Sequence, residues 1–160
     1  MRIVRTARFP RLNGRAGLEP RGAIWVDIRV NGRLLHLVNT HLSLHPRERR
    51  IQAEALVGPE WLSHPDFTGT RILCGDFNAG PNSPAYRQIV EKLRDTQEGH
   101  ETLKPRPTFF SRYPLSRIDH IFVDPATEVL NVEIPSTRLT RVASDHLPLV
   151  VDIAIPREEG

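Results

Sequence analysis

Apolar and polar residues alternate between Gly22 and Val30, and this period of two predicts a half-buried β-strand. Asn31-Gly32 comes directly after this segment and predicts a two-residue type I′ hairpin turn. The return segment, Leu34 to Thr40, is apolar on both faces, so we expect it in the centre of a sheet. The turn sets the register, and the expected pairs are Val30–Arg33, Ile28–Leu35, Val26–Leu37 and Ile24–Asn39. In the first strand we expect the apolar set to face inward and the alternating set to face outward, namely Trp25, Asp27 and Arg29.

Two segments carry helical signals. Pro46 suits a first helical position, and helix-forming residues follow it as far as Val57. Ser83 is a favourable N-cap, and Pro84 would open a second helix that ends at about Leu93. The expected apolar stripe of the first helix comprises Ile51, Ala55 and Leu56.

The other apolar segments are shorter and are predicted as strands. They are Met1–Ala7, at an edge of the sheet, and Arg71–Cys74, Thr108–Phe110, Arg117–Val123, Val129–Ile134 and Leu149–Ile155. Two polar segments, Phe9–Arg21 and Asp95–Pro107, are predicted as loops. A strand-rich chain with two helices is typical of a layered mixed α/β domain, and residues 1–160 suit a single domain.

The composition is that of an ordinary globular protein, because 39% of the residues are hydrophobic and 26% are charged. No apolar run approaches the length that crosses a membrane. Cys74 is the only cysteine and lies in an apolar segment without a partner, so we expect a reducing, cytoplasmic setting.

The basic residues are nearly all arginine, and Lys92 and Lys104 are the only lysines. The planar guanidinium of arginine suits phosphate, so a patch that binds nucleic acid is one interpretation of this bias. A solvated arginine-rich face is the simpler interpretation, and we prefer it. The arginines are most frequent near the N-terminus, at Arg2, Arg5, Arg8, Arg11, Arg15 and Arg21.

Polar side chains suited to catalysis stand at the predicted strand ends. Asp76 and Asn78 directly follow the strand 71–74, and the period of two points both to the same side. A carboxylate and an amide held side by side can orient a water, a hard cation or a phosphate. His41 ends the central strand in the same way.

Two later segments add to this group. Asp119 interrupts an apolar strand, where an ionised carboxylate is costly unless it is paired. Asp145 and His146 precede the last strand. His120 faces the opposite side of its strand from Asp119, and we interpret it as structural.

Together these stretches resemble the endonuclease/exonuclease/phosphatase family, which includes the deoxyribonuclease I-like and exonuclease III-like enzymes. The stretches are NTHL at 39–42, GDFNA at 75–79, RIDHIF at 117–122 and SDHLPLV at 144–150, in the family's order between residues 22 and 155. The resemblance implies a layered α/β sandwich of the deoxyribonuclease I type. It also implies Mg²⁺-dependent hydrolysis of a phosphoester, with Mn²⁺ as the alternative ion. The candidate substrates are DNA, RNA, a phospholipid headgroup and a small phosphoester.

The resemblance further implies a role for each matching residue. His41 would contact the scissile phosphate, and Asn78 would hold a phosphate oxygen. Asp76 would orient or deprotonate the attacking water and, with Asp145, would bind the metal. His146, steered by Asp119, would stabilise charge on the phosphate.

The N-terminal half of the family's domain has no counterpart in this sequence before His41. Its members begin with a strand that carries an Asn and a second strand that ends in Gln-Glu, whose Glu binds Mg²⁺. The early acids here are Glu19, in a predicted loop, and Asp27 in the first hairpin strand, and neither matches. We therefore expect the C-terminal part of the sandwich, with about one of its sheets and with Met1 an internal methionine. A partner chain, a swapped dimer or a missing segment would cover the exposed sheet face.

Two functional hypotheses follow. In the first, the chain is a metal-dependent phosphoester hydrolase that uses the Asp, Asn and His residues named above. In the second, it is a catalytically silent remnant that acts at most as a binding or interaction module. A dinuclear metallophosphatase of another fold is less favoured, because such enzymes need an Asn-His pair that this sequence lacks.

Overall fold

The computed structural model describes residues 1–12, 19–99 and 104–155, and a six-stranded β-sheet organises them. The strand order is β1-β2-β3-β4-β6-β5, in which β3 and β4 run parallel and all other neighbours are antiparallel. The strands are β1 (Arg2–Arg8), β2 (Gly22–Val30), β3 (Arg33–His41), β4 (Thr70–Asp76), β5 (Arg94–Asp95) and β6 (Asp119–Val123). Arg15 and parts of both predicted loops lie outside the described residues.

The predicted hairpin is confirmed in turn type and in register. Asn31 and Gly32 have φ values of 51° and 83°, as a type I′ turn requires. All four predicted pairs between β2 and β3 are present. The central position of β3 and the edge position of β1 are also confirmed.

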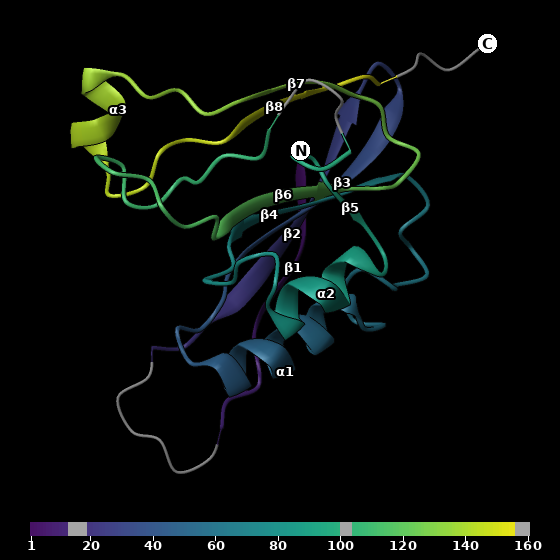
Figure 1. Cartoon of the computed structure of the whole chain (residues 1–160). Helices are drawn as coiled ribbons and strands as arrows, with labels where there is room; N and C mark the ends of the chain where they lie inside the picture. The colour runs from purple at the N-terminus through teal and green to yellow at the C-terminus, as the bar shows by residue number, and fades with distance from the viewer. Residues whose placement is uncertain (13–18, 100–103, 156–160) are drawn as a thin grey trace.

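Helices α1 (Pro46–Val57) and α2 (Pro84–Val90) cover one face of the sheet (Figure 1). The helix α2 ends three residues before the predicted Leu93. The predicted stripe of α1 is only partly right, since its buried residues are Glu48, Gln52, Ala53 and Leu56. The two polar members are buried because each satisfies a loop N–H: Glu48 accepts from the Leu12 backbone and Gln52 from the Ser43 backbone.

The facing of β2 differs from the prediction. Trp25 is 2% exposed and belongs to the core beneath the helices, together with Val38, Leu73 and Phe122. Ile24 and Ile28, on the other face, are only partly buried. Alternation could not decide the facing, because β2 carries apolar residues on both sides and the helices cover the side that holds the larger one.

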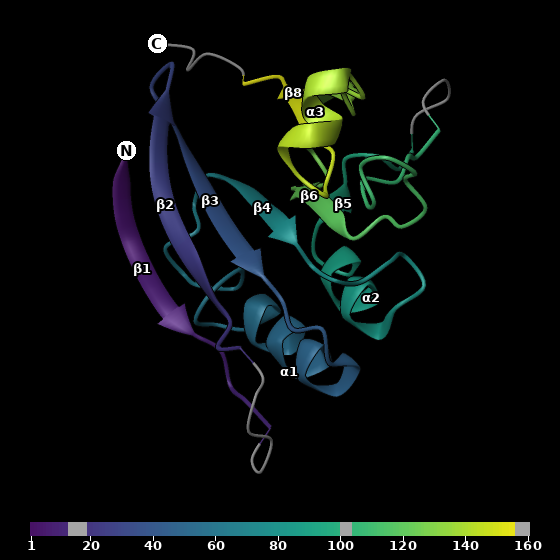
Figure 2. The same cartoon turned by 90° about the vertical axis from the view of Figure 1, so that its left-hand side faces the viewer.

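A second, two-stranded sheet lies on the side of the main sheet that faces away from α1 and α2 (Figure 1). It pairs β7 (Val129–Glu133) with β8 (Val150–Ile153), and helix α3 (Arg138–Ala143), which was not predicted, connects them. The chain therefore holds one sheet and part of another. Figure 2 shows the β8 region beside β6 and away from β1 and β2. The predicted strand at Thr108–Phe110 is wrong: Phe109 forms only isolated bridges, to Ser116 and to His146.

Candidate active site

The ends of three strands bring the predicted site residues together. His41 is the last residue of β3, Asp76 the last of β4 and Asp119 the first of β6. The register pairs His41 with Asp76 and Asp76 with Asp119, so the three lie in one row across the sheet. Because β3 and β4 are parallel, their carboxyl ends lie at the same edge of the sheet, and the polar side chains at these ends lie close together.

The backbone around Asp76 is shaped by two residues with positive φ. At Gly75 φ is 141°, and a Cβ would lie 1.8 Å from the Thr40 carbonyl oxygen, so only glycine fits. At Asn78 φ is 47°, a left-handed conformation that asparagine tolerates better than most residues. Asp76 Oδ1 accepts a hydrogen bond from the Asn78 backbone N–H at 2.8 Å. The carboxylate thus stabilises the turn that carries the amide.

The side chains of Asp76 and Asn78 both contact the His41 ring. The Nε2 atom of His41 lies 3.2 Å from Asp76 Oδ2 and 3.2 Å from Asn78 Nδ2. The same Nδ2 donates to the Leu42 carbonyl oxygen at 3.0 Å, which fixes the orientation of the amide. The His41 side chain is half exposed, so this cluster is open to a ligand.

His146 and Asp119 form the second half of the site. Asp119 Oδ2 lies 2.7 Å from His146 Nδ1 and accepts from the Thr108 hydroxyl at 2.5 Å. The Nε2 atom of His146 lies 3.9 Å from Asp76 Oδ2. Partial burial by itself would lower the pKa of His146, but the hydrogen bond and charge of Asp119, aided by Asp76, raise that pKa overall.

Three of these side chains have ligand atoms close enough to hold a metal ion. One atom each from Asp76, Asp119 and His146 lies within 4.8 Å of the others. Asp145, the other predicted metal ligand, is exposed beside His146 and does not belong to this group of three.

The sequence analysis missed Arg49. Its Nη1 atom donates to the Ser43 and Leu44 carbonyl oxygens, at 3.2 and 3.1 Å, in the segment that follows His41. Burial lowers the pKa of Arg49, and the charge of Asp76 opposes that change. No local signal distinguishes Arg49 from the neighbouring arginines, because its position depends on how α1 packs.

An aromatic pair beside His146 was also missed. The Phe109 ring lies 4.8 Å from the His146 ring, and Phe110 stacks on Phe109 at 3.8 Å. Phe110 is 57% exposed. The sequence signal was present, since two phenylalanines follow Thr108, but it was interpreted as a strand.

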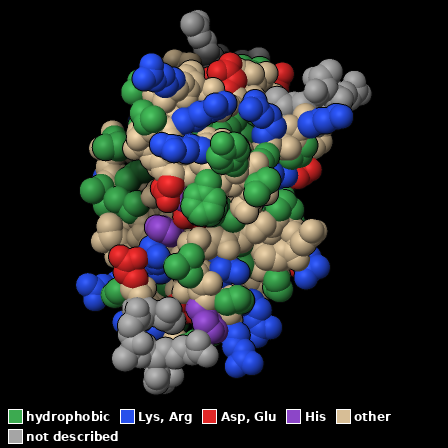
Figure 3. Space-filling view, turned by 60° about the vertical axis from the view of Figure 1, so that its left-hand side comes forward, with side chains coloured by type: hydrophobic (Ala, Val, Ile, Leu, Met, Phe, Trp, Pro, Cys, Tyr) green, Lys and Arg blue, Asp and Glu red, His purple; other side chains and the backbone are tan. Residues whose placement is uncertain are grey.

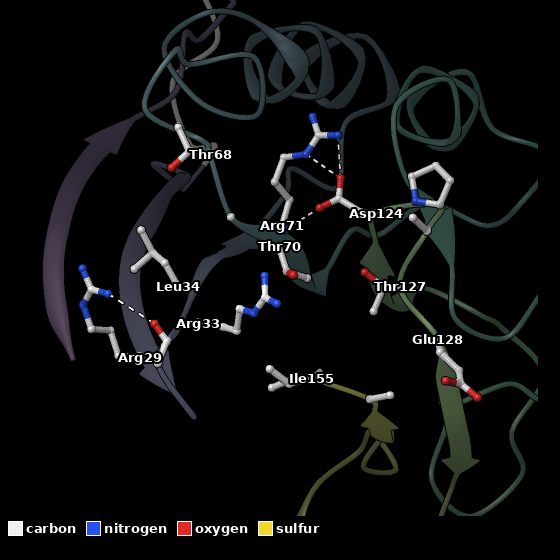
Figure 4. A pocket seen from close by; sticks show the side chains of 15 residues that line it. Arg29, Arg33, Leu34, Thr68, Thr70, Arg71, Asp124, Thr127, Glu128 and Ile155 are labelled. Carbon is white, nitrogen blue, oxygen red and sulfur yellow. Dashed lines mark hydrogen bonds and ion pairs between the residues drawn. The ribbon is translucent and has the colours of Figure 1, made fainter. Parts of the chain in front are cut away.

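A wide cavity of about 940 Å³ lies at the opposite end of the strands (Figure 4). It reaches Thr70, the first residue of β4, whereas the polar cluster surrounds Asp76, the last. Arg71 lines this cavity but is paired there with Asp124. A smaller groove of about 500 Å³ borders His41 and is also lined by Thr6 and Arg8. Chemistry rather than size therefore locates the candidate site.

The arginines near the N-terminus have structural partners in three instances. Arg2 pairs with Asp27, Arg5 with Glu60 and Arg21 with Glu19. Figure 3 shows basic side chains in both the upper and the lower part of the visible face. Among the described helices, none combines the length and the apolar character that crossing a membrane requires.

The amino-acid sequence matches the model of a known protein family. Residues 3–146 match the model of the endonuclease/exonuclease/phosphatase family. The chain belongs to this family.

The chain is also similar to individual proteins and solved structures. The uncharacterized protein YbhP of Escherichia coli K12 is 30% identical over 145 residues, which cover 86% of this chain and 54% of YbhP. The chain thus spans about half the length of the curated relatives it matches. An endonuclease/exonuclease/phosphatase structure from Bacteroides vulgatus has a TM-score of 0.72 at 25% identity, over 96% of this chain and 66% of that one. A mannosyl-6-phosphatase of Bacteroides thetaiotaomicron has a TM-score of 0.75 at 23% identity, over 96% and 67% of the two chains.

Proposed function

We propose that the chain is the C-terminal part of a metal-dependent phosphoester hydrolase, and that the polar row at the ends of β3, β4 and β6 is its active site. The observation that carries this proposal is that two groups of polar side chains both lie next to the Asp76 carboxylate. One group is the cluster of Asp76, Asn78 and His41, and the other is the His146–Asp119 pair. Family membership supports phosphoester chemistry.

His146 is suited to stabilise charge that develops on a phosphate oxygen. Asp119 accepts from Nδ1, which fixes the ring and leaves Nε2 directed toward Asp76 and solvent. Thr108 donates to the same Asp119 oxygen and holds the carboxylate in place. The raised pKa of His146 favours the protonated ring, which can donate to an anionic substrate.

Asp76 is suited to orient or deprotonate the attacking water. Its Oδ1 is committed to the turn, whereas Oδ2 faces the open site. Asn78 Nδ2 carries two hydrogens: one bonds to Leu42, and the other lies on the side of His41 Nε2, where a bound phosphate oxygen would accept it. His41, half exposed beside them, would contact the same phosphate.

The donor set fits a hard divalent cation that keeps most of its waters. Asp119 Oδ2 already receives two donors, so Asp76 is the main carboxylate available, with Asp145 as the second proposed ligand. A bound Mg²⁺ or Mn²⁺ would neutralise charge on the phosphate and acidify a bound water.

The test is metal-dependent hydrolysis of a panel of phosphodiesters, phosphomonoesters and nucleic acids. It should be made on this chain and on a form extended upstream in its own gene. We expect turnover that requires the metal and is abolished by Asp76→Ala, whereas Asp66→Ala, an exposed carboxylate elsewhere, has no effect. Inactivity of both forms on every substrate would refute the proposal.

A catalytically silent binding module is the second candidate, and one observation favours it. Asp27, an early acid, lies on the helix-covered face, where it bonds to His36, Trp25 and Arg2. It is therefore unable to reach the polar row and supply a further metal ligand. Metal-dependent turnover that is lost in Asp76→Ala would rule this candidate out.

Some apolar side chains of β1 and β2 that face away from the helices remain accessible to solvent. Ile3 of β1 is 60% exposed, and Ile24 and Ile28 of β2 are only partly buried. We propose that additional polypeptide, from a longer form of this protein or from a second copy, covers these residues in the active protein.

A further inference from the structure

A buried polar network lies directly beneath the turn that carries Asn78. His120, 1% exposed, occupies the face of β6 opposite Asp119. Its Nε2 lies 2.8 Å from the Ala79 carbonyl oxygen, and its Nδ1 lies 2.9 Å from Asp95 Oδ2. A carbonyl oxygen only accepts, so Nε2 carries a hydrogen. An ionised Asp95 likewise requires a hydrogen on Nδ1.

Asp95 is fixed in turn by other groups. Arg117 donates to Asp95 through Nη2 and to the partly exposed Glu98 through Nη1, so one guanidinium joins two carboxylates. The buried part of this network is rigid, because moving His120, Asp95 or Arg117 leaves another of them without its partner. Two further donors to Asp95 are the Tyr86 hydroxyl and the Gln97 backbone N–H.

The network is connected to the candidate active site by the hydrogen bond from His120 to the Ala79 carbonyl oxygen. Ala79 directly follows Asn78, the residue with a φ of 47°. The N–H of Asn78 is held by Asp76, so the left-handed residue is fixed on both sides. Phe77, 1% exposed, packs edge-on against the His120 ring at 5.7 Å and anchors the same turn in the core.

We propose that His120, supported by Asp95 and Arg117, is a positioning residue for the phosphoesterase site. It holds the Ala79 carbonyl, and thereby sets the conformation of Asn78 and the direction of its amide toward His41. The catalytic part of this inference rests on the proposed function. The structural part, that His120 sets the Asn78 conformation, does not.

His36 provides a matched control within the same sheet. It is also 1% exposed on the helix-covered face, and its Nδ1 lies 2.7 Å from Asp27 Oδ1. In the part of the chain that the structure describes, its Nε2 has no hydrogen-bond partner. This second buried histidine–carboxylate pair therefore makes no link to the site.

The experiment compares His120→Phe with His36→Phe in the full chain. Each replacement keeps an aromatic ring and removes a buried pair, so we expect both to lower the midpoint of urea unfolding. Only His120→Phe should shift the NMR resonances of the Asn78 side-chain amide and of the backbone amides of 75–80. In the kinetic assay, only His120→Phe should lower kcat, by about 10–10²-fold with KM nearly unchanged, as expected for misplaced catalytic groups.

A milder variant covers the case in which His120→Phe does not fold. Asp95→Asn keeps the side-chain volume and should shift the Asn78 amide in the same direction by a smaller amount. The inference is overturned if folded His120→Phe or Asp95→Asn leaves the 75–80 resonances unchanged, or if His36→Phe shifts them equally. Absence of turnover in the unaltered chain would count against the proposed function, while the NMR comparison would still decide whether His120 positions Asn78.

Discussion

Asp119 and His120 are neighbours in β6 but belong to two different histidine–carboxylate pairs on opposite faces of the sheet. In the open pair, His146 is 26% exposed in its side chain and its Nε2 faces Asp76 and solvent. In the covered pair, His120 is fully buried and both ring nitrogens are bonded, to Asp95 and to Ala79.

The comparison indicates that the ring nitrogen not bonded to the carboxylate determines whether a histidine–carboxylate pair can bind a substrate. A carboxylate fixes the ring in both pairs, but only the open pair leaves a nitrogen free to interact with a substrate. In the covered pair the second nitrogen is used to hold the backbone. We therefore expect changes in the open pair to affect catalysis alone, and changes in the covered pair to affect both stability and catalysis.

Among variants of the two histidine–carboxylate pairs, the largest effect is expected for His146→Ala. Loss of a group that stabilises the transition state should lower kcat by about 10²–10⁴-fold. Stability should change little, because the variant removes the hydrogen bond to Asp119 from a partly exposed side chain and keeps the backbone bond to Ser144. Steady-state kinetics together with urea unfolding would measure both quantities. A large loss of stability with normal turnover would contradict the assignment of the open pair.

Asp119→Asn is expected to have the next largest effect. The amide no longer holds a charge beside His146 Nδ1, so the ring loses its fixed orientation and its raised pKa. We expect kcat to fall by about 10²-fold, with the fold intact by circular dichroism. Asp66→Asn, at an exposed carboxylate that does not bond to His146, is the matched control. Equal effects on the nitrogen resonances of His146 in both variants would argue against the pairing.

Asp95→Asn tests the covered pair through its pH dependence. Burial tends to raise the pKa of Asp95, but the hydrogen bonds and charges of His120 and Arg117 lower it overall. A lowered pKa stabilises the fold above the unfolded value of 3.8, and this contribution is lost as pH falls through the folded pKa. The variant should lose about 3–5 kcal/mol of stability at pH 7 and show a flatter acid limb in urea unfolding. Identical acid limbs would refute the assignment.

The smallest effect is expected for Thr108→Val. This replacement keeps the shape of a fully buried side chain and removes the hydroxyl that donates to Asp119. Loss of one hydrogen bond to a charged group should cost about 1–2 kcal/mol, divided between stability and kcat. Thr127→Val, at a partly buried threonine far from the pair, should leave kcat unchanged. An unaltered kcat in Thr108→Val would show that Asp119 does not need this support.

Local signals account for the parts of the fold that the sequence predicted well. Asn31-Gly32 determined the hairpin register because a type I′ turn admits one pairing of its flanking strands. The ends of β3 and β4 at His41 and Asp76 followed from apolar runs that stop at polar residues. The convergence of these ends in one site was implied by the family resemblance, and the parallel pairing of β3 with β4 supplies its physical basis.

Long-range packing accounts for what the sequence did not predict. Asp95 was assigned to a polar loop, but it is 2% exposed because partners distant in sequence, such as His120 and Arg117, bond to it. Arg49 approaches Asp76 only through the packing of α1. The helix α3 is short and has no buried residue, so it lacks the apolar stripe by which a helix is predicted.

The most direct measurement follows the histidine ring resonances by NMR while inorganic phosphate and Mg²⁺ are added. The account predicts saturable shifts at His41 and His146 and none at His120 or His36, because only the first two have a ring nitrogen that faces the open site. These shifts should disappear in Asp76→Ala. Binding that leaves His41 and His146 unchanged, or that shifts the buried histidines equally, would contradict the placement of the phosphate site.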